Sequence, residues 1–194
     1  MRTGILGGTF DPIHIAHLHA GETALSSAAL DRVLFMPAGD PWQKGHRALT
    51  PAKQRLEMTR LAIEGVVGFE LDDREIGRDG PTYTIDTLLG FPADEELFLV
   101  LGADAAVGLP TWHRWEEIVE RAGILVVPRP GTDLTGVVET VPAARVLEMA
   151  ALEVSSTSIR EMAAQGRPYR FLVPLEVHRF IESEGLYTQS GSGR

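Results

Sequence analysis

Short apolar runs alternate with stretches of good helix formers along most of the chain. The runs predict buried strands at residues 3–6, 32–36, 69–71, 97–101 and 124–127, and a late strand at 145–149 within a segment that is hard to interpret. Helices are predicted at residues 15–30, 51–64, 112–121, 155–165 and 175–184, together with a short one that ends at residue 89. Residues typical of helix ends bound several of them, namely Thr50 before Pro51, and Gly65, Gly166 and Gly185 past C-termini.

The predicted strands are continuous apolar runs, with no alternation of apolar and polar positions. Runs of this kind are typical of parallel strands that are buried on both faces. Together with the alternating helices they predict an α/β fold, a single Rossmann-like doubly wound parallel sheet with helices on both faces. Ligands bind beyond the carboxyl ends of such strands, near the switch point in strand order. Gly7, Pro37 and Gly102 each follow a predicted strand, so the site is expected at that edge.

Composition places the chain among ordinary globular proteins. Its 194 residues are 44% apolar and 23% charged, which predicts one domain over residues 1–188 and a disordered polar tail at 189–194. No apolar stretch is as long as a membrane span, and a strand starting near residue 3 leaves no room for a signal peptide. The absence of cysteine excludes disulfides, thiolate metal sites and a cysteine nucleophile. We therefore expect a cytoplasmic location and no membrane partner.

Net charge limits the partners further. A net charge of −9 argues against a nucleic-acid partner, because nucleic-acid binding needs a basic face. An anionic substrate would have to be held by a small local cluster of cations. Nothing in the sequence indicates an oligomeric state.

The first loop, residues 7–17, reads Gly-Gly-Thr-Phe-Asp-Pro-Ile-His-Ile-Ala-His. Its two glycines let the backbone come close to a ligand, and the residue before Pro12 is excluded from helical geometry, which predicts a turn. A helix then begins near His14, and its free N–H groups favour an anion. His14 and His17 leave the same face of its first turn. The loop is therefore predicted to cradle a phosphate.

Other interpretations of this loop are weaker. The chain lacks the G-x-x-x-x-G-K-[ST] motif of P-loops, and the loop lacks the G-x-G-x-x-G dinucleotide motif. His14, His17 and His19 could form a zinc site, but there is no cysteine and Asp11 is the only carboxylate nearby, so no protein-bound metal is predicted. An isolated H-x-x-H pair would more often only cap and solvate a helix end.

The second motif lies near the other end of the chain, at residues 154–160. Four consecutive hydroxyl residues precede a helix and supply an N-cap and further donors. Arg160, in the first turn, could reach the same anion with its planar fork of donors. Taken alone, the segment would more often be a capped helix with a solvated arginine.

Both motifs resemble signatures of the nucleotidyltransferase superfamily. The first resembles the T/H-x-G-H signature in the form carried by bacterial nicotinate-nucleotide adenylyltransferases, with Ala16 in place of the usual glycine. The second resembles I-S-S-T-x-[IL]-R, with Val154 at the isoleucine position. Residues 37–44 resemble P-x-x-x-P-H-K, keeping Lys44 but with Gln43 where histidine is usual. The resemblance extends from residue 3 to residue 187.

The resemblance also covers the middle of the chain. Residues 74–84 are similar to the family's R-x-G-P-[ST]-Y-T segment, and residues 102–112 are similar to its G-x-D…W segment. The resemblance implies catalytic cations at His14, His17, Lys44 and Arg160. It implies ATP contacts at Gly7, Gly8, Thr9, Phe10, Gly102, Asp104, Ser155, Ser156 and Thr157. It implies contacts with nicotinate mononucleotide at Thr82, Tyr83, Thr84, Trp112 and Arg129.

Within that last group, the resemblance implies that Thr84 and nearby backbone N–H groups receive the nicotinate carboxylate. Trp112 would stack on the pyridine ring, for which indole is well suited. Arg129 is a weaker candidate for the phosphate of the mononucleotide. Trp115 is expected to pack in the core.

The implied reaction transfers AMP from ATP to nicotinate mononucleotide, giving deamido-NAD and pyrophosphate, with Mg²⁺ bound mainly through ATP. The attacking phosphate monoester is mostly dianionic at neutral pH because its second pKa is about 6, so no general base is needed. The histidines are expected to be charged mainly in the ATP complex.

Other activities remain open. The chain could be an adenylyltransferase that acts on nicotinamide mononucleotide or on phosphopantetheine. The segment 82–84 and Trp112 argue against phosphopantetheine, whereas acid and amide are separated only weakly. A non-catalytic nucleotide-sensing module should have lost a catalytic cation, and all of the expected cations are present.

Overall fold

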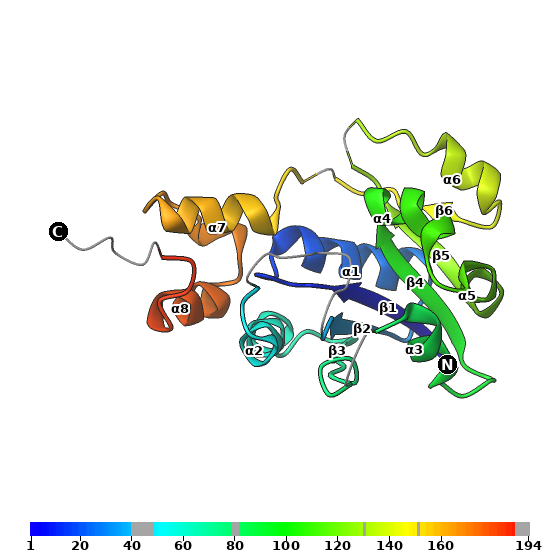
Figure 1. Ribbon diagram of the computed structural model, residues 1–194, viewed down its shortest axis with the longest axis horizontal. Coiled ribbons are helices and arrows are strands. Elements are labelled where there is room, and N and C mark those ends of the chain that lie inside the picture. The colour runs from blue at the N-terminus through cyan, green and yellow to red at the C-terminus, as the bar shows by residue number, and fades with distance from the viewer. Residues whose placement is uncertain (40–48, 79–81, 130, 151, 189–194) are drawn as a thin grey trace.

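The computed structural model describes residues 1–39, 49–78, 82–129, 131–150 and 152–188. The strands are β1 (Arg2–Gly8), β2 (Arg32–Pro37), β3 (Phe69–Leu71), β4 (Glu96–Gly102), β5 (Ala122–Val127) and β6 (Arg145–Val146). The helices are α1 (Ile15–Ser27), α2 (Ala52–Ile63), α3 (Thr84–Leu89), α4 (Ala103–Gly108), α5 (Trp115–Arg121), α6 (Thr135–Thr140), α7 (Ser156–Ala164) and α8 (Leu175–Ser183) (Figure 1). Two short 3₁₀ helices are η1 (Leu109–Thr111) and η2 (Arg170–Leu172). Lys44 and the predicted tail at 189–194 lie outside the described residues.

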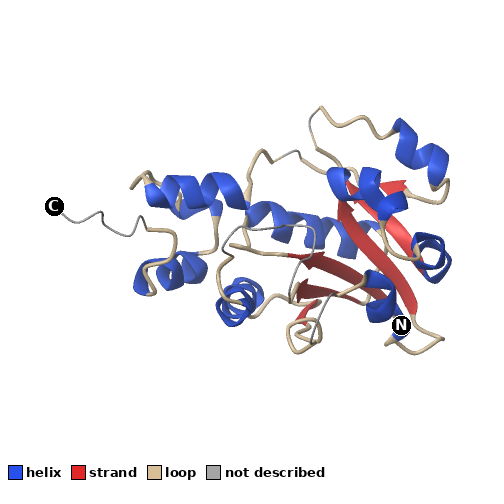
Figure 2. Cartoon of the chain, viewed as in Figure 1, coloured by secondary structure: helices blue, strands red, loops and turns tan. Residues whose placement is uncertain are grey.

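All of these strands belong to one parallel sheet (Figure 2). The spatial order is β3-β2-β1-β4-β5-β6, and every neighbouring pair runs parallel. The chain builds outward from β1 to β3 and then returns to place β4 on the other side of β1. The switch in direction therefore falls between β1 and β4, where a parallel sheet opens a crevice at its carboxyl edge. The prediction of a doubly wound parallel sheet is confirmed.

Helices cover both faces of the sheet because successive strand residues point to opposite sides. On one side Leu6, Val33 and Phe35 pack with buried residues of α1, α2, α7 and α8. On the other side Ile5 and Leu34 pack with buried residues of α3, α4, α5 and α6. Among the described residues, no helix is long and apolar enough to cross a membrane.

Helix α1 ends three residues before the predicted end at residue 30. The backbone of Ala29 takes a left-handed conformation, with φ of 47°. The N–H of Leu30 donates to the carbonyl of Leu25 (3.0 Å), and the N–H of Ala29 donates to that of Ser26 (3.3 Å). This is a Schellman ending that uses alanine where glycine is usual, so the usual sequence signal was missing.

The predictions for several other elements were also wrong in detail. The helix predicted at residues 112–121 begins only at Trp115, after η1 and a left-handed Arg114 with φ of 55°. Helices α4 and α6, of six residues each, were not predicted. The late strand β6 has two residues of the five predicted. Pro51, rather than Thr50, occupies the N-cap position of α2.

A buried polar cluster joins β1, β2 and the turn before β4 at the amino edge of the sheet. Thr3 donates its hydroxyl hydrogen to Glu95 (2.5 Å), and Arg32 donates to the same carboxylate oxygen (3.0 Å). The Glu95 side chain is only 6% exposed. Burial raises the pKa of Glu95, but the hydrogen bonds from Thr3 and Arg32 outweigh it, so the net shift is downward. The ionised carboxylate therefore stabilises the folded state.

We predict that Glu95→Gln lowers the free energy of unfolding at pH 7 by about 1–3 kcal/mol, because a buried, charged acceptor of two hydrogen bonds is lost. The folded-state pKa is depressed, so the contribution is complete above the unfolded value of about 4.3 and is lost as the pH falls through the folded value. Urea unfolding measured from pH 7 to pH 3 should show that the difference in the free energy of unfolding between wild type and Glu95→Gln shrinks as the pH falls below about 4.3.

The neighbouring Glu96 provides the control for this prediction. It pairs with Arg2 (2.9 Å) on the surface, where both side chains are about half exposed. Glu96→Gln should therefore change stability by less than about 1 kcal/mol. Equal losses for the two variants at pH 7, or a gap that widens in acid, would show that the Glu95 cluster is not stabilising.

Candidate active site

A cavity of about 410 Å³ opens at the carboxyl edge of the sheet, at the switch point between β1 and β4. Gly7 and Gly8 from the end of β1 and Gly102 from the end of β4 lie in its wall. A Cβ atom added to Gly7 or Gly102 would meet nothing within 4 Å. The glycines thus leave open space where any side chain would stand between the backbone and a ligand.

His14 and His17 lie in the wall of this cavity at the start of α1. Their rings stack, with centroids 3.7 Å apart and planes 19° from parallel. The N–H of His14 donates to Nδ1 of His17 (3.2 Å). Because Nδ1 of His17 accepts this bond, its proton is carried by Nε2, which is the nitrogen that can donate to a ligand.

The side chain of Phe10 packs against the ring of His17. Its ring is 2% exposed and meets the ring of His17 edge to face, with centroids 5.0 Å apart. A Cβ atom on Gly8 would come within 2.7 Å of the same ring. Phe10 is therefore buried beneath the glycine turn, and its side chain does not line the cavity, although it was predicted to contact ATP.

The imidazole of His14 is neutral at pH 7 in the free protein. Burial, and after it the positive charge of Arg129, lowers the pKa of His14 to about 4. Its Nδ1 is buried and has no hydrogen-bond partner among the described residues. A buried nitrogen in this position is normally satisfied by a ligand or a water molecule.

The start of α7 lies against the first loop, so the two motifs from opposite ends of the chain come together. Ser156 donates its hydroxyl hydrogen to the carbonyl of Pro12 (2.9 Å), and Arg160 donates to the carbonyl of Asp11. Arg160 also donates to the hydroxyl of Thr157 (2.9 Å). Ser155 caps the helix by accepting from the N–H of Ser158 (3.1 Å). Ser156 and Arg160 therefore bind the loop that carries the histidines.

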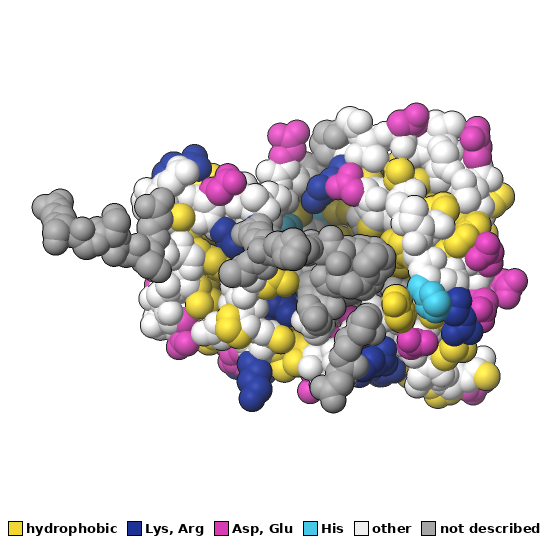
Figure 3. Space-filling view, in the orientation of Figure 1, with side chains coloured by type: hydrophobic (Ala, Val, Ile, Leu, Met, Phe, Trp, Pro, Cys, Tyr) yellow, Lys and Arg dark blue, Asp and Glu magenta, His cyan; other side chains and the backbone are white. Residues whose placement is uncertain are grey.

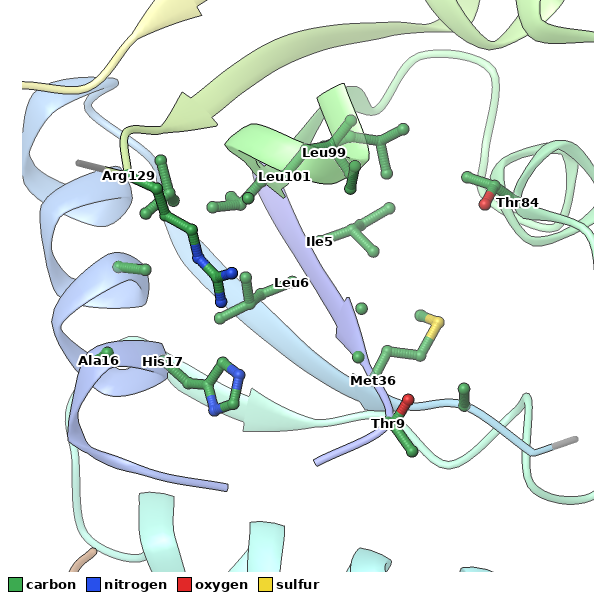
Figure 4. Close-up of a pocket in the computed structure, with 18 of the residues that line it drawn as sticks. Ile5, Leu6, Thr9, Ala16, His17, Met36, Thr84, Leu99, Leu101 and Arg129 are labelled. Carbon is green, nitrogen blue, oxygen red and sulfur yellow. The ribbon is translucent and has the colours of Figure 1, made fainter. Parts of the chain in front are cut away.

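Arg129 reaches over the cavity from the end of β5. Figure 4 shows its guanidinium directed toward Leu6 and His17, with Thr84 on the opposite side of the cavity. Its Nη1 donates to Asp104 at the start of α4 (2.8 Å), and both side chains are more than half exposed. Asp104 thus holds Arg129 at the rim.

The acceptor segment forms the far wall. Thr82, Tyr83, Thr84 and Trp112 all line the cavity, as does His113. The rings of Tyr83 and His113 approach each other, with centroids 4.5 Å apart. This wall is therefore rich in flat rings and hydroxyl groups.

A partly buried carboxylate also lines the cavity. Glu75 accepts a hydrogen bond from the hydroxyl of Thr87 (2.9 Å), and burial raises its pKa. Both residues line the cavity.

The structure brings most of the predicted site residues to one cavity. Those that line it are Gly7, Gly8, Thr9, His14, His17, Thr82, Tyr83, Thr84, Gly102, Trp112 and Arg129. Those described but outside its lining are Phe10, Asp104, Ser155, Ser156, Thr157 and Arg160. Lys44 lies outside the described residues.

Sequence reasoning missed residues that shape or support the cavity. His113 and Glu75 line it, and each is next to or within a segment already singled out. Arg55 supports it from α2, where its guanidinium donates to the carbonyls of Thr9 (2.7 Å), Gly39 (2.9 Å) and Thr50 (3.0 Å).

Arg55 could have been recognised from helical spacing. It is 1% exposed and lies on the same buried face of α2 as Met58, Thr59 and Ala62. A cation at an apolar position of a helix must find internal partners, so it marks a site of tertiary contact.

No metal cage is apparent in the described part of the chain. The described residues contain no group of three or more His, Cys, Asp or Glu side chains that could hold a metal ion. Acidic and basic side chains are interspersed over the described surface of the face in Figure 3.

Comparisons with known proteins agree with this architecture. The cytidylyltransferase-like family model matches residues 5–162. A probable nicotinate-nucleotide adenylyltransferase of Acidothermus cellulolyticus is 42% identical over 206 residues, covering 100% of this chain and 97% of the relative. A probable nicotinate-nucleotide adenylyltransferase of Pseudomonas entomophila is 41% identical over 211 residues, covering 97% of this chain and 96% of the relative.

A solved structure shares the fold. The nicotinic acid mononucleotide adenylyltransferase of Plasmodium falciparum complexed with NaAD superposes with a TM-score of 0.81 at 18% identity, over 96% of this chain and 97% of that one. With the family match and the full-length relatives, the chain belongs to the cytidylyltransferase-like family and, within it, to the nicotinate-nucleotide adenylyltransferases.

Proposed function

We propose that this protein transfers AMP from ATP to nicotinate mononucleotide, giving deamido-NAD and pyrophosphate, as a step of NAD biosynthesis. One observation carries the proposal. A single cavity joins the two imidazoles of His14 and His17 to a wall of rings and hydroxyls at Thr84 and Trp112. Full-length similarity to nicotinate-nucleotide adenylyltransferases supports the same activity.

The reaction needs positioning more than acid–base chemistry. A phosphate oxygen of the mononucleotide forms a bond to the α-phosphorus of ATP, while the bond from that phosphorus to the bridging oxygen breaks and pyrophosphate leaves. The attacking oxygen is already ionised at neutral pH, because the second pKa of a phosphate monoester is about 6. The protein must therefore bring two polyanions into line and stabilise the charge that develops.

The donors at the start of α1 are suited to the α-phosphate. Nε2 of His17 would donate to the ligand, because Nδ1 accepts from the N–H of His14. The neutral ring of His14 can add a second hydrogen bond without the cost of holding a buried charge. The unpaired N–H groups of the first turn add to the favourable potential.

The charge of the histidines in the ATP complex stays a prediction. Bound phosphate would favour imidazolium at either ring. For His14 the shift would have to start from a pKa of about 4. We therefore place the larger electrostatic contribution on His17.

The remaining ATP contacts follow from the same placement. Gly7, Gly8, Thr9 and Gly102 would approach the nucleotide with their backbone, and Phe10 would act through the turn that it supports. Asp104 would contact ATP at the rim. Ser155, Ser156 and Thr157 would contribute from the start of α7. Lys44 and Arg160 would supply positive charge to the phosphates, with Arg160 also fixing the loop.

The acceptor would lie against the far wall. Trp112 would stack on the pyridine ring, and backbone N–H groups of residues 82–84, with the hydroxyl of Thr84, would receive its carboxylate. Tyr83 would contribute to the same subsite. Arg129 would turn from Asp104 to the phosphate of the mononucleotide, since both anions compete for one guanidinium.

Magnesium would arrive with ATP. The described residues offer no cluster of acidic ligands, so the phosphates would supply most of its coordination. The ion would neutralise phosphate charge during the transfer. We propose a cytoplasmic location for this activity.

A substrate panel tests the function. Purified protein should release pyrophosphate from MgATP with nicotinate mononucleotide, and its kcat/KM should be lower for nicotinamide mononucleotide and near background for phosphopantetheine. A preference for the amide would point to a nicotinamide mononucleotide adenylyltransferase. Binding of ATP without turnover of any acceptor would favour the non-catalytic nucleotide-sensing module.

We predict that His17→Ala lowers kcat by about a hundredfold and changes the affinity for ATP far less, because its bond strengthens as charge develops on the phosphate. Steady-state kinetics and calorimetric titration with a non-hydrolysable ATP analogue measure the two effects. His19→Ala, on the same helix but outside the cavity lining, is the control. Normal turnover by His17→Ala would remove this residue from the mechanism.

We predict that Trp112→Ala raises KM for nicotinate mononucleotide by about tenfold and leaves KM for ATP nearly unchanged, because only the acceptor ring loses its stacking surface. Trp115→Phe, which alters a ring packed beside the same core, is the control. Equal increases of both KM values in Trp112→Ala would reject the stacking role.

A further inference from the structure

Tyr187, which follows α8, reaches the loop that carries the histidines. Its hydroxyl donates to Oδ1 of Asp11 (2.8 Å) across 176 residues of sequence. Asp11 is 3% exposed, so this bond lies in the interior. Burial, and after it the Asp11 carboxylate, raises the pKa of Tyr187 above its usual value, so the hydroxyl keeps its proton and donates.

The backbone on both sides of this contact is held in an uncommon conformation. Phe10, next to Asp11, has φ of 49°, and Tyr187 itself has φ of 64°. Aromatic residues rarely adopt left-handed geometry, and they keep it only where surrounding contacts determine it. The Tyr187–Asp11 bond ties these two strained positions together.

The segment between Asp11 and the first histidine is short. Pro12 and Ile13 lie between Asp11 and His14, and Ile13 is fully buried. The carbonyls of Asp11 and Pro12 are held by Arg160 and Ser156. A shift of the Asp11 side chain would therefore be passed to the start of α1, where the histidines lie.

Among the described side chains, only Tyr187 donates a hydrogen bond directly to the Asp11 carboxylate. Nη1 of Arg160 lies 3.9 Å from its other oxygen and is directed to the carbonyl instead. Removing the Tyr187 hydroxyl would leave a buried carboxylate free to turn toward Arg160, which would pull that guanidinium away from the loop carbonyl.

We propose that Tyr187 is a positioning residue for adenylyl transfer, which through Asp11 and Arg160 fixes the loop that presents His14 and His17 to the α-phosphate. The inference rests on the proposed function for its kinetic consequence. It assigns a role in the reaction to the C-terminal segment, which lies outside the cavity lining.

The test compares Tyr187→Phe with Tyr169→Phe. Tyr169 is a matched control, because its hydroxyl also donates to a carboxylate in the same C-terminal region, that of Glu182 (2.5 Å), and not to a residue of the first loop. Tyr187→Phe should lower kcat about tenfold to a hundredfold, since small misplacements of catalytic groups have effects of this size. KM for nicotinate mononucleotide should change less than about threefold, and Tm should lie within about 4 °C of that of Tyr169→Phe.

A second measurement does not depend on the reaction. Hydrogen–deuterium exchange of a peptide covering residues 9–18 should be at least about tenfold faster in Tyr187→Phe than in Tyr169→Phe, because the loop opens more often. If wild-type protein fails to transfer AMP, the proposed function fails, and this exchange result alone decides whether Tyr187 positions the loop. Equal exchange in the two variants, or equal kcat in an active enzyme, would overturn the proposal.

Discussion

The structure depends on how the carbonyl groups of the first loop are satisfied. Between β1 and α1 the backbone belongs to neither a sheet nor a helix, yet it is buried, and buried carbonyls need partners. Arg55 binds the carbonyl of Thr9, Arg160 binds that of Asp11, and Ser156 binds that of Pro12. Residues far away in sequence thus hold the loop, and this is why the two ends of the chain must fold onto each other.

That constraint explains how an acidic protein can bind two polyanions. The net charge is −9, but the Asp11 carboxylate accepts a hydrogen bond from Tyr187 and is not among the described residues that line the cavity. His14 is neutral in the free protein, and Arg129 is held at the rim by Asp104. The positive potential is therefore local, built from N–H groups, imidazole protons and a few cations at one edge of the sheet.

The sequence predicted the parts of the fold that depend on local patterns. Apolar runs located β1 to β5, and glycines at Gly7 and Gly102 marked the carboxyl edge because a close backbone approach needs them. The hydroxyl run at residues 155–158 correctly predicted the N-cap of α7. The meeting of the two motifs was expected from the family resemblance, and the structure brings them into contact.

What sequence could not supply was the partner of each charged group. That Arg160 supplies charge to a phosphate stays a prediction, but its bond to the Asp11 carbonyl was not predicted, because nothing local in the sequence specifies that contact. Helical spacing could have marked Arg55 as buried, but its partners could not be named, because they are backbone carbonyls, which every residue has. The end of α1 was misplaced because Ala29 replaces the usual glycine. The contacts of Arg160 and Arg55 share one cause, since tertiary packing decides them and local propensity does not.

The central claim is that the anchored first loop presents Nε2 of His17 to the α-phosphate of ATP. A crystal structure of the protein with a non-hydrolysable ATP analogue and magnesium measures this directly. The account predicts Nε2 within hydrogen-bond distance of an α-phosphate oxygen, about 2.7–3.2 Å, with Nδ1 still accepting from the N–H of His14. A triphosphate bound away from this loop, or one that meets His17 through Nδ1, would contradict it.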